Sequence, residues 1–570
     1  MSASGAGTLD YRSTEGSSHD KILFWGCVIA LITTAFGFIA RMFLISTWAT
    51  EFNLDPAQSG RLAGIGIWPF AASIIGFSLI IDKIGYKVAM VMAFLGHILW
   101  AVMATSAFFI SKNGDKHTAY QMLYWGSLIL ALANGTVEAF INPVVATMFS
   151  REKTKWLNIL HAGWPGGLVL AGIVTIFMGN AAWWIKVGIL AVPAIVYFIM
   201  LLPLKFPVQE REAAGVSYRD MLAEFGFLGA AIVGFLLILQ FMDFFTGLPK
   251  FQEKIIRDGA EIIVLVSWLK WTIIAIGVAI TLAFGAYTRS LGRPFLFFMI
   301  LIMIPLATTE IGTDGWITSI MEGITAGKFH PGWILVYTSI IMVIMRFFAG
   351  PIVHAISPLG LLAVSAGLAI IGLYTLSFTA GMAIFVAATV YGFGKTFFWP
   401  TMLGVVSEQT PRGGAMTLNA ISGIGMLAVG VLGFPYIGAL QADKKIEAIA
   451  ATSAAKTAGL VTSDGKLVPE VLDPRYIYEV IHYKVVNDDK LNARIAMLPK
   501  EKKDEIAAAA ASSSQRALKN MTVFPGIMLV GYIILIGYFL SRGGYKAQVL
   551  TGHAAEDKRF TGGVPGPMEA

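Results

Sequence analysis

Long apolar runs recur along this chain at short intervals, and they constrain its fold more than any other feature. A helix needs roughly 17–25 apolar residues to cross a membrane. Runs of about this length lie at 22–48, 58–81, 88–110, 119–148, 157–178, 182–203, 225–247, 261–287, 294–312, 332–353, 358–378, 382–405, 415–440 and 521–541. The sequence therefore predicts an all-α polytopic membrane protein with about fourteen spanning helices.

The composition agrees with this interpretation. Charged residues make up 14% of the 570 residues, whereas a soluble domain carries roughly 25%. The net charge of +7 does not indicate nucleic-acid binding, because no basic stripe is interleaved with aromatic residues. The single cysteine excludes a disulfide within the chain. We find no metal, nucleophile or cofactor motif in the sequence, so we expect no cofactor and no enzyme.

Loop charge predicts the orientation of the helices, because cytoplasmic loops are enriched in Lys and Arg. With an internal N-terminus, the internal segments that carry these residues are 82–87, 151–155, 205–224, 288–293, 407–414 and 541–546. An even number of helices then places both termini in the cytoplasm. We expect a monomer in the lipid bilayer of a bacterial inner (plasma) membrane.

An internal repeat relates two of the runs. NGTVEAFINPVVATMFS (134–150) matches YGFGKTFFWPTMLGVVS (391–407), and Pro143 and Pro400 each precede a serine by seven residues. A charged loop and the dipeptide LN follow in both copies. Without the two helices at 225–287, six plus six helices remain. Parallel six-helix halves with the binding site at their interface are a known transporter architecture.

This repeat divides the chain into successive parts. They are a cytoplasmic leader (1–20), an N-terminal six-helix half (21–204), a cytoplasmic linker (205–224), two extra spanning helices (225–293), the first five helices of the C-terminal half (294–440), an extracytoplasmic insertion (441–520), the last spanning helix (521–541) and a cytoplasmic tail (542–570). The insertion is Ala- and Lys-rich with helical stretches, and we expect it to form a helical cap.

Charged residues inside the apolar runs are the candidate site. A charge at the middle of the bilayer costs roughly 2.5–3.5 kcal/mol on insertion scales, and such residues usually face a cavity. They are Arg41, Glu138, Glu310, Asp314 and Lys395. Glu138 and Lys395 each precede a repeat proline by five residues, so they occupy equivalent positions. A structural ion pair between the halves is the alternative to a transport role.

Other polar and aromatic residues join this set. Asn142 lies four residues after Glu138 on the same helical face. Aromatic faces stack on sugar rings, and a few convergent polar groups fix a ligand's orientation. The further candidates are His161, Trp164, Trp316, Trp399 and Asn419. The alternatives are a core histidine and tryptophans at the membrane interface.

Two loop motifs resemble those of the major facilitator superfamily. SLIIDKIGYK (78–87) looks like that superfamily's motif between helices two and three, and RFFAGPIVHAISPLG (346–360) resembles its second-half copy. The matching residues are Asp82, Lys83, Gly85, Lys87, Arg346 and Gly350. The resemblance implies a cytoplasmic gate at these residues and a central cavity lined by helices one, four, seven and ten.

The pattern ExxxNP, formed by Glu138, Asn142 and Pro143, is similar to the fucose–proton symporter branch of that superfamily. The resemblance implies that Glu138 binds both proton and sugar. That branch carries a carboxylate late in helix one, whereas this chain has Arg41. Burial favours the neutral form of a carboxyl group and a nearby cation favours the ionised form. Movement of Lys395 or Arg41 would therefore switch Glu138.

We therefore expect a secondary active transporter that moves a small hydrophilic solute, with sugar as first choice. Alternating access would be coupled to a proton through Glu138, with sodium as the other candidate ion. An organic anion such as a sugar acid, bound by Arg41 and Lys395, is the alternative substrate. A nutrient sensor that binds without transport is the alternative of another class.

Overall fold

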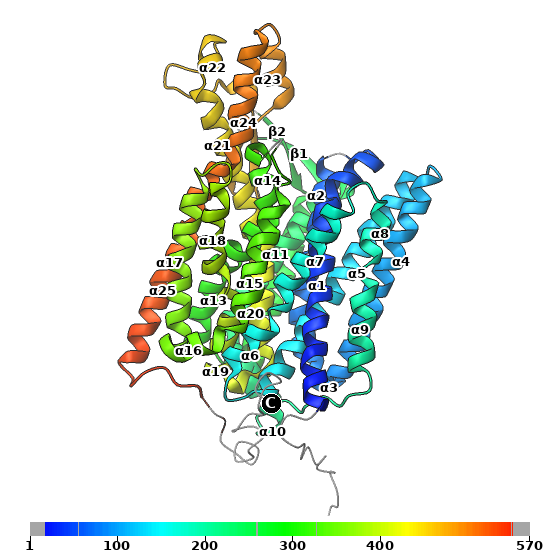
Figure 1. Cartoon of the computed structure of the whole chain (residues 1–570), viewed down its shortest axis with the longest axis vertical. Coiled ribbons are helices and arrows are strands. Elements are labelled where there is room, and N and C mark those ends of the chain that lie inside the picture. Colours follow the sequence, from blue (N-terminus) through cyan, green and yellow to red (C-terminus); the bar gives the residue numbers. More distant parts are fainter. Residues whose placement is uncertain (1–17, 55, 258–259, 326–327, 549, 551–570) are drawn as a thin grey trace, which may run out of the picture.

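The computed structural model describes residues 18–54, 56–257, 260–325, 328–548 and 550, and it forms a helical bundle with two halves. Among the described residues, twelve helices are long and apolar enough to cross a membrane. The count becomes thirteen if one helix pair bent by 66° forms a single span. Figure 1 shows the N-terminal half in blue and cyan beside the green, yellow and red C-terminal half.

The N-terminal half contains the first six predicted spans, three of which are broken in two. Its helices are α1 (Ser18–Phe52), α2 (Pro56–Gly64), α3 (Trp68–Ile84), α4 (Tyr86–Lys112), α5 (Lys116–Met148), α6 (Lys153–Leu160), α7 (Gly163–Phe177), α8 (Trp183–Gly188) and α9 (Ala191–Leu201). Proline follows each of the three breaks, at Pro69, Pro165 and Pro193. Because proline lacks an N–H group, it favours such breaks.

The C-terminal half has the same organisation, with two π-helical turns. Its elements are α13 (Pro294–Ala307), η2 (Thr308–Gly312), α14 (Thr313–Thr325), α15 (Gly332–Phe347), α16 (Ala349–Ile356), α17 (Pro358–Leu376), α18 (Ala383–Lys395), α19 (Phe398–Gln409), η3 (Pro411–Gly413), α20 (Gly414–Ala428), η4 (Val429–Gly433), α21 (Phe434–Ala451) and α25 (Val523–Leu540). The predicted span 382–405 is divided between α18 and α19, of 13 and 12 residues. The pair α15–α16 bends by 66°.

The two extra helices are α11 (Tyr218–Thr246) and α12 (Ser267–Thr288). A hairpin of β1 (Gln252–Arg257) and β2 (Ala260–Leu265) joins them. The predicted span 261–287 therefore begins too early, because its first residues pair in β2. Helix α12 packs along α11 and buries only Leu269 and Thr288 among its described residues, so most of its surface is left for lipid.

The insertion projects from the end of the bundle opposite to the start of α1 and the end of α25, which we call the termini end (Figure 1). Helix α21 continues into it, and α22 (Ser453–Thr457), η5 (Pro469–Val471), β3 (Leu472–Ile477), β4 (Ile481–Val486), α23 (Asp488–Ile495) and α24 (Lys500–Met521) follow. It has its own small core, which includes Ile449, Leu460 and Ile506. The prediction of a helical cap is therefore incomplete, because the insertion also contains an antiparallel hairpin of β3 and β4.

This second hairpin contacts the first. The Glu479 carboxylate, in the turn between β3 and β4, lies 2.5 Å from Lys270 Nζ of α12. The Glu479 carbonyl accepts a hydrogen bond from Arg257 of β1. The insertion is thus attached to the extra helices as well as to α21 and α25.

Candidate functional site

A small closed cavity lies at the interface of the two halves, with room for little more than a water molecule. Its lining residues are Phe70, Glu138, His161, Trp164, Glu310, Ile311, Arg346, Trp399 and Met426. Five of the predicted substrate-site residues meet here, from α5, from the break between α6 and α7, from η2 and from α19. The cavity contains one carboxylate from each half, Glu138 and Glu310.

On the N-terminal side, Glu138 begins a chain of hydrogen bonds. Asn142 Nδ2 donates to Glu138 Oε2 at 2.7 Å, as expected for residues one helical turn apart. Asn142 Oδ1 in turn lies 2.9 Å from His161 Nε2 and accepts a hydrogen bond from it. All three side chains are buried. In the described part of the chain, no cationic nitrogen lies within 4.0 Å of the Glu138 carboxylate.

On the C-terminal side, Glu310 is paired. Its Oε1 lies 3.0 Å from Arg346 Nη2, and its Oε2 accepts the backbone N–H of Trp399 at 3.0 Å. The residue sits in the π-helical turn η2, a local widening of the helix that is frequent at functional sites. Both members of the ion pair are 1% exposed. Each charge is therefore neutralised within the protein.

Arg346 also joins the two halves. Pro165 and Pro400 lack an N–H group, so the carbonyls four residues before them lose their usual helical donor. These carbonyls belong to His161 and Thr396, and both accept hydrogen bonds from the Arg346 guanidinium. One arginine thus donates hydrogen bonds to a carbonyl at a helix break in each half and to one carboxylate.

Pro143 creates a third free carbonyl, at Ala139. Asn419 Nδ2 of α20 donates to it at 2.9 Å, across the interface of the halves. Asn419, predicted for the site, thus lies at the interface and contacts backbone there. The repeat prolines therefore serve a common purpose, because each frees a carbonyl that binds a polar side chain of another helix.

Lys395 pairs within its own half. Its ammonium group forms a buried ion pair with Asp314, the first acidic residue of α14, and lies 5.4 Å from the centre of the Tyr391 ring. The structure therefore does not bring Lys395 to Glu138, its counterpart in the repeat. The other oxygen of Asp314 has no hydrogen-bond partner among the described residues.

Arg41 lies outside the cavity lining. Its Nη1 donates to the carbonyls of Leu62 and Ala63, at 2.5 and 3.0 Å, at the end of α2. A Cβ atom on Gly66 would lie 1.9 Å from Arg41 Nη2, so the guanidinium needs glycine in the α2–α3 connection. Arg41 thus caps a helix C-terminus, where a cation is favourable.

The three predicted tryptophans do not all lie at the cavity. Trp164 and Trp399 line the cavity, and the Nε1–H of Trp164 has no acceptor among the described residues. Trp316, in α14, is half-buried and packs edge-on against Phe434, with 6.3 Å between ring centres.

The predicted gate residues occupy several places at the termini end of the bundle. Asp82 pairs with Arg211 of the linker helix α10 (Glu210–Ala213) at 2.5 Å, and Lys83 lies 5.0 Å from the ring centre of Tyr218. Gly85 has φ +83°, a conformation that favours glycine. Lys87 is exposed, and Gly350 lies against the side chain of Lys155. Arg346, predicted for this gate, instead lines the cavity.

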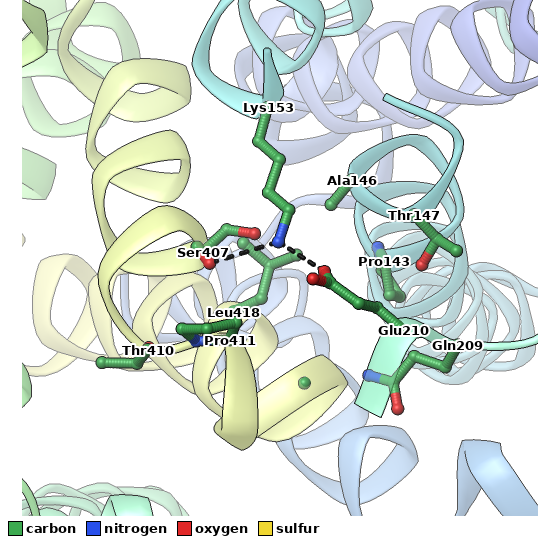
Figure 2. Close-up of a pocket in the computed structure, with 11 residues that line it drawn as sticks. Pro143, Ala146, Thr147, Lys153, Gln209, Glu210, Ser407, Thr410, Pro411 and Leu418 are labelled. Carbon is green, nitrogen blue, oxygen red and sulfur yellow. Dashed lines mark hydrogen bonds and ion pairs between the residues drawn. The ribbon is translucent and has the colours of Figure 1, made fainter. Parts of the chain in front are cut away.

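The linker closes the same end of the bundle by further contacts. Figure 2 shows Lys153, at the start of α6, directed toward the linker residue Glu210 and the carbonyl of Ser407 in α19. Its Nζ lies 2.5 and 3.5 Å from these groups. Thr154 binds the Glu408 carboxylate through both its N–H and its hydroxyl group. We call these contacts between α6, α10 and α19 the termini-side clamp.

One acid beside this clamp has a pKa above its usual range. Desolvation raises the pKa of Glu212 in α10, and the nearby Asp82 charge raises it further, while Arg211 opposes both effects.

Sequence reasoning missed the linker's part in the clamp, although the basic and acidic residues of 205–224 were a signal. It also missed Arg346 in the cavity, although an arginine in an apolar run was a signal there.

The chain is similar to known proteins in sequence and in structure. A family model for the Major Facilitator Superfamily matches residues 26–316, about half of the chain. Similar solved structures include the E. coli fucose:proton symporter FucP, with 13% identity over 88% of this chain and 98% of that chain, at TM-score 0.46. A bacterial homologue of the human lysosomal transporter Spinster has 13% identity over 93% of this chain and 99% of that chain, at TM-score 0.49.

The human organic anion transporter MFSD10 has 9% identity over 91% of this chain and 100% of that chain, at TM-score 0.49. No curated protein sequence matches the chain significantly. The family match includes all of the N-terminal half from residue 26 onward and extends through η2, where Glu310 lies. The chain is therefore an integral membrane protein that belongs to the major facilitator superfamily of transporters.

Proposed function

We propose that this protein is a proton-coupled transporter of a small polyhydroxylated solute, a sugar or sugar-like compound, which it moves by alternating access through the closed cavity. Its termini and the termini-side clamp would face the cytoplasm of a bacterial cell, as the basic loops suggest. The observation that supports this proposal most directly is that the buried carboxylates differ in whether a cation lies beside them. Glu310 and Asp314 each have a cation, whereas Glu138 has none within 4.0 Å in the described part of the chain.

Charge burial connects this contrast to proton coupling. An unpaired carboxylate is costly in a closed apolar site, and protonation removes that cost. A protonated Glu138 is therefore compatible with closure around solute. For the empty carrier to return without a proton, a cation must neutralise Glu138, and Arg346 lines the same cavity. The proton would thus travel with the solute.

The cavity chemistry supports an uncharged, hydroxyl-rich solute. Glu138 and His161 supply hydrogen-bonding groups, and Trp164 supplies an indole N–H without an acceptor among the described residues. The Trp164 and Trp399 rings supply flat apolar surfaces of the kind on which sugar rings stack. Opening of either end would enlarge the cavity and admit the solute.

The contacts of Arg41 and Lys395 do not favour the organic-anion alternative. Arg41 is bonded to carbonyls at the end of α2, and Lys395 is paired with Asp314. An anionic solute would have to displace one of these partners. Competition between neutral sugars and the corresponding uronates would separate the two substrate classes, because only neutral sugars should compete well.

The test is a solute panel in proteoliposomes that contain a pH-sensitive dye. A transported sugar should acidify the lumen during uptake. Glu138→Gln should abolish net uptake and acidification while solute exchange survives. The matched control is Glu51→Gln, a carboxylate of the N-terminal half that binds Trp183 Nε1 outside the cavity lining, and it should behave as wild type.

Three results would contradict the proposal. Acidification that persists in Glu138→Gln would remove the coupling role of this residue. Solute binding without uptake would identify a sensor. Failure of every solute to move under any gradient would refute transport of this class.

A further inference from the structure

A second and larger space lies outside the central cavity, between the extra helices and the bundle. This groove has a volume of about 370 Å³ and lies between α11, α12, α3 and the first turn of α20. Its lining is apolar almost throughout, with residues such as Ile75, Val233, Ile238 and Phe284. All four helices belong to membrane-spanning segments. The groove is thus an apolar space that opens toward hydrocarbon rather than water.

The dimensions of the groove suit one kind of occupant. Its lining on α11 runs from Phe225 to Phe241, which is about 24 Å along a helix. One leaflet contributes about 15 Å to the hydrocarbon core of a bilayer. An acyl chain therefore has enough length of groove to lie in, and an empty groove of this length would forfeit packing contacts on every side.

Two cations lie near the termini end of the groove, and one of them is in an exposed pair with Asp220. An exposed pair of this kind contributes little to stability, so an anion can compete for its cation. Leu79 lines the groove, and its carbonyl accepts a hydrogen bond from Tyr218 at 2.8 Å. The Lys83 ammonium, one turn beyond Leu79 on α3, lies 5.0 Å from the Tyr218 ring centre. Arg412 is four residues before the lining residue Met416, and it pairs at 3.9 Å with Asp220, two residues after Tyr218.

The two cations thus lie near the first turn of α11, at one end of an apolar groove. A phosphate group is the partner that Lys and Arg favour at such a position. We propose that this groove binds one phospholipid with an anionic headgroup, its acyl chain lying between α11–α12 and α3–α20 and its phosphate held near Lys83 and Arg412. The bound lipid fills the gap between the extra helices and the bundle.

The test is native mass spectrometry of the detergent-purified full chain, with dioleoylphosphatidylglycerol and dioleoylphosphatidylcholine added as probes. One phosphatidylglycerol should remain bound at collision energies that remove phosphatidylcholine. Val233→Trp, which fills the groove, should abolish this retention. Val278→Trp is the matched control, because Val278 lies on α12 outside the groove lining and is 46% exposed. It should retain the lipid.

A second variant keeps the proposal testable if Val233→Trp fails to fold. Lys83→Gln with Arg412→Gln should weaken phosphatidylglycerol binding about fivefold for each cation removed. It should weaken phosphatidylcholine binding less, because the choline cation offsets the charge of that lipid's phosphate. Equal retention of both lipids by the wild type, or unchanged retention by folded Val233→Trp, would overturn the proposal. Loss of retention in Val278→Trp alone would also overturn it.

Discussion

The two halves of this transporter bury their acids in different ways. In the C-terminal half, Glu310 and Asp314 each contact a cation, and Arg346 is bonded to three partners at once. In the N-terminal half, Glu138 accepts a hydrogen bond from the amide of Asn142, and Asn142 is hydrogen-bonded in turn to His161. Among the described residues, this series of hydrogen bonds contains no ion pair.

The difference separates two uses of buried charge. An ion pair with further hydrogen bonds holds its members ionised, and removal of one member leaves an uncompensated charge. A carboxyl group bonded to an amide can gain or lose a proton with fewer contacts to break. The C-terminal half therefore supplies fixed charges, and in the proposed mechanism the N-terminal half supplies the group that changes charge.

Arg346→Met should have the largest effect on stability. It leaves Glu310 without its cation, the Thr396 carbonyl without its side-chain donor and the His161 carbonyl with only the Trp164 N–H, so the free energy of unfolding should fall by about 3–5 kcal/mol. Thermal unfolding of the detergent-purified protein measures this change. Arg346→Met with Glu310→Gln should recover part of the loss. A single variant as stable as wild type would remove the structural role given to the C-terminal pairs.

Lys395→Met should come next, at about 3 kcal/mol, because it also leaves a buried carboxylate unpaired. The loss should be smaller than for Arg346, since no proline-freed carbonyl depends on Lys395. The same unfolding measurement applies, and the double variant Lys395→Met, Asp314→Asn should approach wild-type stability. If the double variant is no more stable than the single one, the ion pair is not the cause.

Asn419→Ala should cost about 1–2 kcal/mol, because the Ala139 carbonyl then has neither an amide nor a proline N–H as donor. Pro143→Ala restores a backbone donor to that carbonyl. In a double-mutant cycle, Asn419→Ala should therefore cost less in the Pro143→Ala background. Equal costs in both backgrounds would contradict the role given to the repeat prolines.

Glu138→Gln should have the smallest effect on stability, within about 1 kcal/mol, because glutamine retains an oxygen that accepts from Asn142. It should nevertheless abolish coupled uptake, which makes it the sharpest test of the comparison. A destabilisation as large as that of Arg346→Met would show that Glu138 is also a fixed structural charge, and the contrast between the halves would disappear.

Much of the architecture could be predicted from the sequence, because membrane spans are defined by length and apolarity. The i,i+4 spacing correctly placed Asn142 against Glu138. The hairpin β1–β2 was missed, since residues 262–265 are as apolar as the helix that follows them. The hairpin β3–β4 was missed inside an Ala-rich segment with helical stretches.

The partners of the charged residues were harder to predict. Position along a helix gives the depth of Arg41 and Lys395, but their partners depend on how each helix is rotated about its axis. That rotation is set by packing, which turns Arg41 toward the end of α2 and Lys395 toward Asp314. Arg346 was assigned to the gate from its loop motif, whereas the broken helices at Pro165 and Pro400 draw it into the cavity.

The attachment of the insertion has a practical consequence. Helix α21 enters this water-exposed domain, α24 leads back to α25, and Glu479 ties it to the extra helices. With three anchors it should travel with the C-terminal half as one piece. If that half moves as the proposed alternating access requires, a fluorophore or antibody fragment on the outer surface of the insertion would report the movement from outside the detergent micelle. The same asymmetric mass gives a natural alignment marker for single-particle imaging of a transporter otherwise hidden in detergent.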